Sequence, residues 1–541
     1  LERGLITPDQ LRIALEVQRA TGRLLGETLV DLGFISSATL SSLVSEGAGV
    51  ASLPSLEDLL PDSQALRLVP RELAAKHRLV PLSVEDDHLV VAMADPYDVV
   101  AVDELRRVTG RPLRTLVAPE EEILKALDRW YESEGELEDL VRRALAGEAR
   151  EEEAPVVGIV NQLLAMAVQE RATDVHIEPQ RNAMLVRYRV DGVLQVRHSL
   201  PKALEPRVVS RIKVMANMDI SETRRPQDGR AEFRFGGRTL DLRISCFPVT
   251  AGENVVIRIL DRARLLTRLD ALGYAPEQLE ALRRLIRRRE GILLVTGPTG
   301  SGKTTTLYAA LSEVNTTAVN IMTLEDPVEY ELPFVRQSQV NPRAGLGFAQ
   351  GLRSILRQDP DVIMVGEIRD AETLEVAMHA ALTGHLVLST LHTNSALGAI
   401  PRLLHLGASP HLLASTLIGV VAQRLVRRIC PYCRAEYAPA EPEANLLEEQ
   451  LGTRPERLWR GAGCVRCRDT GYLGRTVVAE VLQVDPRVAA LVEARAGLEE
   501  LEQAVRERGF RSMLEDALQK AAAGVTTLEE VQRVVSLHGY G

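Results

Sequence analysis

One glycine-rich stretch has the residue types and spacing of a phosphate-binding loop: Gly297-Pro298-Thr299-Gly300-Ser301-Gly302-Lys303-Thr304. It follows the apolar run 291–296, which predicts a buried strand, and it precedes an apolar helix. Glycines let backbone N–H groups turn towards phosphate oxygens, and the N-terminus of the helix adds positive potential. We expect Lys303 to reach the β- and γ-phosphates and the Thr304 hydroxyl to bind Mg²⁺. The predicted nucleotide-binding residues are Gly297, Pro298, Thr299, Gly300, Ser301, Gly302, Lys303, Thr304 and Thr305.

Two acidic segments follow the loop. The apolar run 362–366 predicts a second buried strand and ends at Glu367, where phosphate-loop enzymes bring a carboxylate to the metal ion and its water. Residues 323–329 hold three acids within five positions. In isolation such a segment is a solvated turn, but after an apolar strand of a nucleotide-binding domain it favours a role in activating water.

A third strand pattern, 386–391, is flanked by His385 and His392. A single histidine at a strand end is more often structural. Two of them in the same domain as a phosphate site suggest either sensing of the γ-phosphate or contact between subunits.

Four of the five cysteines form two C-x-x-C pairs: Cys430, Cys433, Cys464 and Cys467. Two such turns can present four thiolates tetrahedrally, the arrangement that structural Zn²⁺ prefers. The spacing between the pairs exceeds the usual ~15–20 residues, and we interpret the insert 435–463 as a loop. A redox-active dithiol is the alternative interpretation.

These residues must be positioned by several domains. A 29-residue repeat at the N-terminus pairs Gly4-Leu5-Ile6 with Gly33-Phe34-Ile35, each followed by an amphipathic helix pattern. A mostly parallel sheet is predicted after residue 272, and the apolar stretch 412–421 is interpreted as a buried helix. The predicted organisation is an N-terminal module (1–131), an acidic linker (132–154), an α/β domain (155–262) and a phosphate-loop domain (272–541) with the cysteine insertion at about 428–475 and a helical C-terminus from about 485.

The composition is that of an ordinary globular protein. The 541 residues are 45% hydrophobic and 26% charged, with a formal net charge of −10, which does not favour non-specific nucleic-acid binding. Five cysteines are too few for a disulfide scaffold of this size. No run approaches the ~20 apolar residues of a membrane span, and no signal-peptide pattern is visible. We therefore expect a cytoplasmic protein, and the start at Leu1 suggests a fragment of something longer.

The combination of motifs resembles the secretion ATPase superfamily, the hexameric motors of type II secretion and type IV pilus assembly. The resemblance covers residues from about 155 to 541 and has the phosphate loop, the acidic segment, the strand ending at Glu367 and the segment 384–392 in family order. The upstream domain also matches, in Thr173–Pro179, Arg187–Gly192 and Gln227–Arg230. The resemblance implies an α/β fold in which a RecA-like ATPase domain follows a PAS-like domain and a small N-terminal helical and α/β module.

The resemblance also implies roles for single residues. It assigns the catalytic glutamate to Glu329, and handling of Mg²⁺ or its water to Glu367. It implies that Arg243 and Arg258 reach the nucleotide phosphates. The expected catalytic set is Glu329, Glu367, Arg243, Arg258, Arg353 and His392. For each arginine, and for Arg230, the alternative role is an ordinary surface salt bridge.

The four cysteines, with Thr470-Gly471-Tyr472 after them, match the zinc-binding insertion of the assembly and secretion branch, which retraction motors generally lack. The N-terminal repeat resembles modules that bind cyclic di-GMP in some relatives. Here Leu24-Leu25-Gly26 stands where Arg-Leu-Gly is expected and Gly47 replaces the closing Gln, so we favour a structural or docking module over a dinucleotide site.

The resemblance implies a homo-hexameric ATPase, peripheral to the inner membrane, that uses ATP and Mg²⁺ to drive pilin or pseudopilin assembly by rotating or pushing an inner-membrane platform protein. One alternative is a nucleotide- or cyclic-dinucleotide-binding platform that does not hydrolyse ATP, which would lack Glu329 or Glu367. Another is a DNA-translocating helicase, which should show a basic track with interleaved aromatic residues. With 4% aromatic residues and an acidic balance, we expect no nucleic-acid track.

Overall fold

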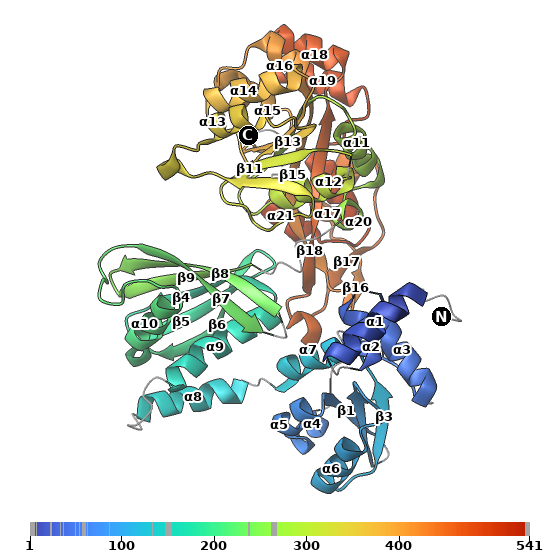
Figure 1. Cartoon of the computed structure of the whole chain (residues 1–541). Helices are drawn as coiled ribbons and strands as arrows, with labels where there is room; N and C mark the ends of the chain where they lie inside the picture. The colour runs from blue at the N-terminus through green and yellow to red at the C-terminus, as the bar shows by residue number, and fades with distance from the viewer. Residues whose placement is uncertain are drawn as a thin grey trace. The chain divides into compact units, whose positions relative to one another are not determined.

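The computed structural model of the chain describes residues 6, 8–21, 24–32, 34–35, 37–48, 50–53, 55–56, 61, 63–85, 87–131, 134–146, 154–235, 238–260, 268–316 and 318–535. The chain divides into two compact units, residues 1–261 and residues 262–541 (Figure 1). None of the helices in the described part of the chain has the length and apolar character that a membrane-spanning segment requires.

The first unit begins with three helices: α1 (Pro8–Thr21), α2 (Leu25–Asp31) and α3 (Ser37–Ala48). Helix α1 contains Leu11 and Leu15 of the first copy of the predicted repeat, and α3 contains the corresponding pair of the second copy. The glycines of the two predicted turns, Gly4 and Gly33, lie outside the described residues.

A three-stranded sheet follows in the order β1-β2-β3, antiparallel between the first two strands and parallel between the last two. Leu79 and Met93 of the sheet and Leu105 and Ile123 of the helices are fully buried in one core. The elements of this module are α4 (Ser63–Leu68), α5 (Arg71–Lys76), β1 (Leu79–Glu85), β2 (His88–Met93), α6 (Val99–Thr109), β3 (Leu113–Val117) and α7 (Glu120–Tyr131).

The rest of the first unit is built on a six-stranded antiparallel sheet in the order β6-β5-β4-β9-β8-β7. Its elements are α8 (Glu134–Ala146), α9 (Ala154–Gln169), β4 (Ala172–Pro179), β5 (Ala183–Val190), β6 (Val193–Pro201), α10 (Glu205–Met215), β7 (Gln227–Phe235), β8 (Arg238–Val249) and β9 (Gly252–Leu260). Alternate strand residues pack against α9 and α10, and Tyr188 donates a 2.6 Å hydrogen bond to the Leu163 carbonyl of α9. Helix α8 lies within the segment interpreted as a solvated linker, and its Leu137 is buried in this core.

The second unit is built on a seven-stranded sheet in the order β12-β11-β13-β14-β10-β15-β18. All neighbouring pairs are parallel except β15 and β18, so the predicted mostly parallel sheet is confirmed. The strands are β10 (Gly291–Thr296), β11 (Ile321–Glu325), β12 (Val335–Gln339), β13 (Val362–Val365), β14 (Leu386–Leu391), β15 (Leu417–Ile429) and β18 (Tyr472–Gln483), with β16 (Arg434–Tyr437) and β17 (Leu458–Gly461) forming a separate pair.

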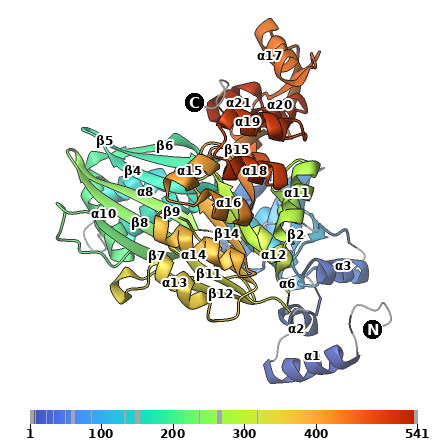
Figure 2. The ribbon, with the colours of Figure 1, turned by 90° about the horizontal axis from the view of Figure 1, so that it is seen from above.

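Helices cover both faces of this sheet, and its strands β10, β13 and β14 are buried at every position (Figure 1). Ile292 and Leu294 of β10 pack on one side with α13 and α14, whereas Leu293 and Val295 pack on the other side with α11 and α12. Helix α16 contacts both α14 and α18 (Figure 2). The helices are α11 (Pro276–Ile286), α12 (Lys303–Val314), α13 (Phe348–Ile355), α14 (Ala371–Leu382), α15 (Ala399–His405), α16 (Pro410–Thr416), α17 (Glu441–Leu451), α18 (Pro486–Glu493), α19 (Leu498–Arg506), α20 (Met513–Ala522) and α21 (Leu528–Val534).

Two predictions in this unit were wrong. The stretch 412–421 is not one buried helix: α16 ends at Thr416 and β15 begins at the next residue, because β-branched residues there add a buried strand beside β10. The cysteine insert is not a loop either. It contains β16, α17 and β17, and Leu447 of α17 is fully buried.

Candidate active site and metal centre

The glycine-rich loop connects the carboxyl end of β10 to the first turn of α12. Gly297, Gly300 and Gly302 have φ of 149°, 79° and 87°, which L side chains rarely adopt. A Cβ atom on Gly297 would also lie only 2.6 Å from the Gln423 carbonyl oxygen, so neither the backbone nor the space allows a side chain there. The local geometry therefore requires the glycine spacing that the sequence shows.

Lys303 begins α12, and its ammonium group donates hydrogen bonds to the carbonyl oxygens of Gly297 (2.8 Å) and Pro298 (3.1 Å). Burial lowers the pKa of Lys303, Glu367 opposes that shift and Arg424 adds to it. The lysine thus lies within electrostatic reach of a carboxylate and of a second cation. A cation held by two neutral carbonyls is poised to exchange them for a more negative partner.

The carboxyl ends of two neighbouring parallel strands bring together Glu367, which follows β13, and His392, which follows β14. His392 Nε2 lies 3.7 Å from Glu367 Oε2, and the Glu367 side chain is only 14% exposed and also pairs with Arg369. Burial and Lys303 lower the pKa of His392, while Glu367 raises it. The net result is a pKa of His392 below its usual range.

Thr296, the last residue of β10, fixes this convergence. Its hydroxyl lies 2.8 Å from the Thr393 hydroxyl and accepts a 2.8 Å hydrogen bond from the Thr393 backbone N–H. The other predicted histidine is remote: His385 precedes β14, at the opposite end of the sheet, and its ring nitrogen bonds the Ala380 carbonyl oxygen at 2.9 Å. Of the two histidines, only His392 is brought to the phosphate loop.

The acids of residues 323–329 differ in their surroundings. Glu325 is buried and accepts hydrogen bonds from Tyr308, from Thr323 (2.5 Å) and from Gln337 (3.1 Å). Glu329 lies beyond the strand, is partly exposed, and its backbone N–H is 3.4 Å from the Tyr308 hydroxyl. Glu325 is therefore engaged in the fold, and Glu329 is the partly accessible glutamate of the segment.

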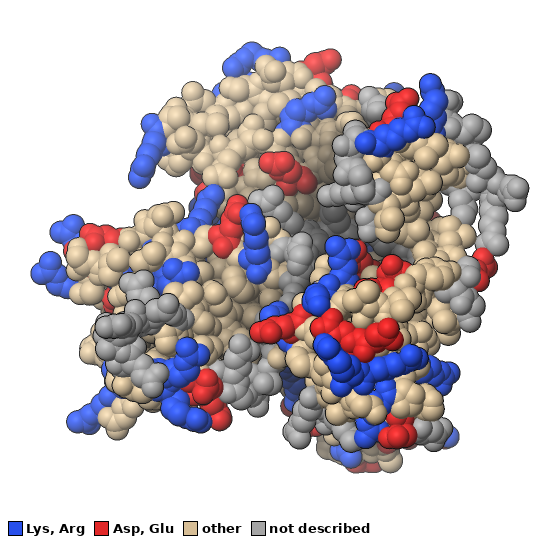
Figure 3. Space-filling model, turned by 60° about the horizontal axis from the view of Figure 1, so that its bottom comes forward, with Lys and Arg blue, Asp and Glu red and all other residues tan. Residues whose placement is uncertain are grey.

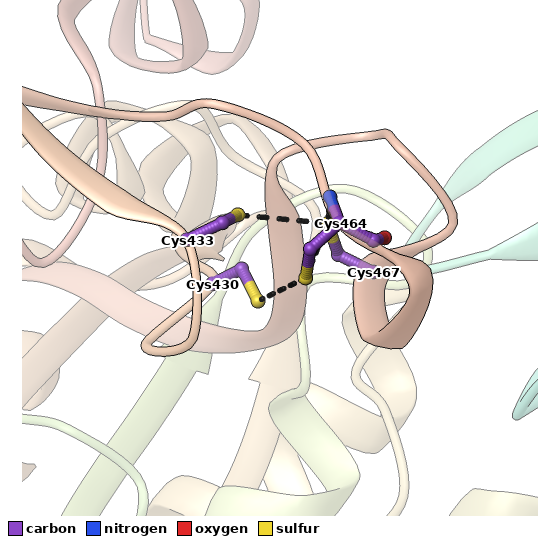
Figure 4. Close-up of side chains that lie close together, drawn as sticks. All are labelled: Cys430, Cys433, Cys464 and Cys467. Atoms are coloured by element: carbon purple, nitrogen blue, oxygen red, sulfur yellow. Dashed lines mark hydrogen bonds between the residues drawn. The ribbon is translucent and has the colours of Figure 1, made fainter. Parts of the chain in front are cut away.

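The four cysteine sulfurs lie within 4.8 Å of one another (Figure 4). The separations are 3.8 Å for Cys430–Cys464, 3.7 Å for Cys433–Cys467 and 3.6 Å for Cys464–Cys467. A tetrahedral ion with Zn–S bonds of about 2.3 Å requires sulfurs about 3.8 Å apart, so the donor set and its size fit Zn²⁺. The Cys467 backbone lowers the pKa of Cys464 to about 7, whereas burial raises the pKa of Cys433 to about 12. A divalent cation would favour the thiolate of each.

Comparison with known proteins agrees with this geometry. Residues 149–533 match the family model described as type II/IV secretion system protein. The chain is 42% identical to the type IV pilus assembly ATPase PilB of Myxococcus xanthus, over 98% of this chain and 96% of that protein. It is 43% identical to the type II secretion system protein E of Xanthomonas campestris, over 99% of this chain and 97% of that protein. The chain belongs to the type II secretion and type IV pilus assembly ATPase family.

Two further similarities concern parts of the chain. Residues 51–137 match the MshEN domain model, so the predicted N-terminal repeat at 4–44 lies outside that match. The solved structure of the ATPase DotB from Legionella pneumophila covers 70% of this chain and 95% of its own, with a TM-score of 0.52 and 23% identity. At that identity the likeness supports the mixed α/β fold of this secretion ATPase and nothing finer.

The predicted arginines of this family member lie in two different places. Arg243 of β8 and Arg258 of β9 are direct neighbours in the antiparallel register, and Arg258 donates a 3.1 Å hydrogen bond to the buried Asp174 of β4. Arg353 of α13 pairs at 2.7 Å with Glu372 of α14, and both side chains are exposed. In this structure, Arg353 thus takes part in a surface salt bridge.

Three polar residues near the site were missed from the sequence, and two of them, Gln423 and Glu480, are buried. Gln423 of β15 is fully buried and donates a 2.8 Å hydrogen bond to the Ser301 carbonyl of the phosphate loop. Arg424 lies within electrostatic range of Lys303, and Glu480 of β18 accepts backbone N–H groups from distant segments. The available signal was polar residues inside apolar strands, since Gln423 and Arg424 directly follow the apolar run 417–422.

Proposed function

We propose that this chain hydrolyses ATP and, as a homo-hexamer, drives pilin or pseudopilin assembly through an inner-membrane platform protein. The observation that carries the proposal is the phosphate loop with Glu367 and His392 beside Lys303, in a chain whose near full-length relatives are named as pilus assembly and secretion ATPases. We also propose that the segments 1–131, 155–262 and 272–541 act as separate domains.

In this mechanism the backbone N–H groups of residues 297–302 and the N-terminus of α12 receive the phosphates of ATP. Lys303 exchanges the two carbonyl groups that it now bonds for the β- and γ-phosphate oxygens. Bound Mg²⁺ would supply charge neutralisation, and the Thr304 hydroxyl and Glu367 are the groups that would hold it or its water. These two residues offer a hydroxyl oxygen and the oxygens of a mostly buried carboxylate, and Mg²⁺ prefers oxygen ligands.

Glu329 is proposed to orient and deprotonate the attacking water, because it is the partly accessible glutamate of the acidic segment. His392 donates a hydrogen bond from its ring N–H to the γ-phosphate. Arg243 and Arg258 stabilise the charge that develops on the transferred phosphoryl group. Arg353 is retained as a candidate for the same task only if its salt bridge with Glu372 opens.

We propose that the chain has no basic track for nucleic acid, because its formal net charge is −10 and only 4% of its residues are aromatic. On the three-stranded module, Lys76 pairs with Glu104 (2.9 Å) and Arg78 pairs with Glu120 (2.9 Å). Basic and acidic side chains are interspersed on the face shown in Figure 3. Addition of single-stranded DNA should therefore leave the ATPase rate unchanged, whereas strong stimulation would favour the helicase.

We also infer that the N-terminal module, which matches the MshEN model over residues 51–137, is a docking or regulatory part of the motor. Titration of the full chain with cyclic di-GMP tests the regulatory version. Saturable binding at micromolar concentration would establish a dinucleotide site, and its absence would favour docking.

The central test is Lys303→Ala. We expect turnover to be abolished with the fold intact, because the charge of Lys303 is directed to phosphate groups and its side chain carries little packing. Arg284→Ala removes an exposed cation of the same unit that pairs with Glu280, and it should keep normal turnover. ATP turnover like that of the unaltered chain in Lys303→Ala would reject the motor.

A further inference from the structure

Glu480 is a buried carboxylate that joins two distant segments of the second unit. It lies on β18 and is 2% exposed. Its Oε1 accepts the backbone N–H of Ala396 at 2.5 Å, and its Oε2 accepts the backbone N–H of Met513 at 3.0 Å. Met513 is the first residue of α20, so the carboxylate also lies at the positive end of a helix. A buried carboxyl group with such partners is held in one place.

The Ala396 side of this link leads directly to the phosphate loop. Ala396 ends the short segment 392–396, which begins with His392 after β14. Within it, Thr393 bonds Thr296 at the end of β10, and Asn394 accepts hydrogen bonds from the Arg424 guanidinium, at 3.1 Å through its side-chain oxygen. The segment is thus fixed at three points.

The three points differ in what they connect. Thr296 and Arg424 both belong to strands beside the phosphate loop, so their bonds hold the segment within the nucleotide site. Glu480 is the one that also bonds the C-terminal helices, through Met513. Both of its oxygens take part in this link, since each accepts one backbone N–H.

We propose that Glu480 is a positioning residue, which holds the segment 392–396 against the start of α20 and so sets the place of His392 beside Lys303. The inference rests on the proposed ATP hydrolysis at this site. Glu480 itself touches no group that we place in the chemistry, and it acts through the backbone of Ala396.

The substitution that tests this is Glu480→Gln, which preserves size but replaces one acceptor oxygen by an NH₂ group. That NH₂ would face a backbone N–H, so one of the two bonds is lost and two donors oppose each other. A matched control is Asp516→Asn. Asp516 is equally buried and accepts the Ala479 N–H at 2.9 Å and the Lys520 ammonium at 2.7 Å, but it bonds nothing in 392–396.

Two measurements on the full chain separate a positioning role from a general loss of stability. Steady-state ATPase assays below the unfolding temperature should show kcat lowered about 10–100-fold in Glu480→Gln, with KM for ATP changed far less. Hydrogen exchange should show faster exchange at 391–398 in this variant. Asp516→Asn should lower the unfolding temperature but keep kcat and the exchange of 391–398 near those of the unaltered chain.

The proposal is overturned if Glu480→Gln keeps both the kcat and the 391–398 exchange rate of the unaltered chain, or if both variants lose kcat in proportion to stability. If Glu480→Gln does not fold, Ala396→Pro replaces it and should give the same two results, because it removes the N–H on the segment side while leaving the bond to Met513, although its ring also restricts the backbone there. Exchange needs no turnover. An unaltered chain that fails to hydrolyse ATP would therefore reject the proposed function, while the exchange comparison would still decide this inference.

Discussion

Gln423 donates a 2.8 Å hydrogen bond to the carbonyl oxygen of Ser301, and this bond connects β15 to the middle of the phosphate loop. The other end of the same amide accepts hydrogen bonds from Tyr274 (2.6 Å) and from Thr306 of α12 (3.0 Å). Ser301, Tyr274 and Thr306 are all buried. If the Gln423 amide is removed, each of them loses a hydrogen bond that water cannot replace. The shape of the loop is therefore set from outside the loop.

The first prediction concerns Gln423→Leu. It should weaken ATP binding at least tenfold, because Ser301 and Thr306 lose the group that orients them, and should lower the free energy of unfolding by about 2 kcal/mol. Gln278→Leu is the control, since Gln278 is also buried but bonds Ala479 and Ala275 instead. Titration with a fluorescent ATP analogue and urea unfolding measure the two effects. Equal loss of ATP affinity in both variants would show that Gln423 has no specific link to the loop.

The second prediction separates two glutamates of the acidic segment. Glu329→Gln should bind ATP normally and lose hydrolysis by 100-fold or more, about the contribution of a general base. Glu325→Gln should instead lower stability, because Glu325 accepts three hydrogen bonds in the core. Single-turnover assays and thermal unfolding distinguish the outcomes. Loss of ATP binding in Glu329→Gln would make the segment structural.

The third prediction is one zinc ion per chain at the four cysteines. Cys464→Ser should lose the ion. Cys246→Ser should keep it, because Cys246 lies in the first unit and is not one of the four cysteines of the site. Chelation should loosen residues 428–475 and leave ATP binding unchanged, because the four cysteines lie between β15 and β18, whereas the phosphate loop lies between β10 and α12. Metal analysis that finds well below one equivalent in the unaltered chain would reject the site.

The fourth prediction concerns pH and Glu530 of α21, which is fully buried and bonds Arg427 of β15 and Arg533. Burial would raise the pKa of Glu530, but the hydrogen bonds from Arg533 and Arg427 outweigh it and the pKa is lowered. A carboxylate whose folded pKa lies below its unfolded value stabilises the fold above pH ~4.3, and that contribution disappears as pH falls through the folded pKa. Glu530→Gln should therefore cost about 3 kcal/mol at neutral pH, and less in acid.

Trp459 offers a local signal for this measurement, because it packs against Gly524 between α20 and α21. Urea unfolding followed by its fluorescence, in a Trp130→Phe background, compares Glu530→Gln with the exposed neighbour Glu529→Gln. The same stability difference at every pH would contradict the ionic origin of the effect.

The fifth prediction tests how the arginines of the first unit act. Arg243→Ala and Arg258→Ala should each lower turnover strongly while ATP affinity falls modestly, since extra positive charge contributes most in the transition state. Mixing Lys303→Ala protein with Arg243→Ala protein then tests whether the arginines act on the nucleotide of their own chain or on that of a neighbouring subunit. Recovery of activity in mixed rings would place the arginines across an interface. Unchanged turnover in both single variants would reduce them to salt bridges such as Arg258–Asp174.

The sequence was most informative where one local rule determines the structure. The glycines of the phosphate loop, the two C-x-x-C turns and the apolar strand β10 each follow from spacing within a few residues. Gln423, Arg424 and Glu480 could not be found in this way, because their partners lie more than 25 residues away in the chain. Likewise, the cysteine insert was wrongly predicted to be a loop, because charged residues outnumber the few apolar residues, such as Leu447, that are buried in the core.

The register of β15 and β18 has a further consequence for the cysteine-containing segment. Ile429 and Tyr472 face each other as the last pair of that antiparallel ladder, and both C-x-x-C turns lie between them in the chain. Topologically, the whole metal-binding insert is therefore the loop of one β-hairpin, with its two ends a single strand spacing apart. A short turn can connect the same two ends. The insert can therefore be gained or lost without a change in the strand order of the seven-stranded sheet.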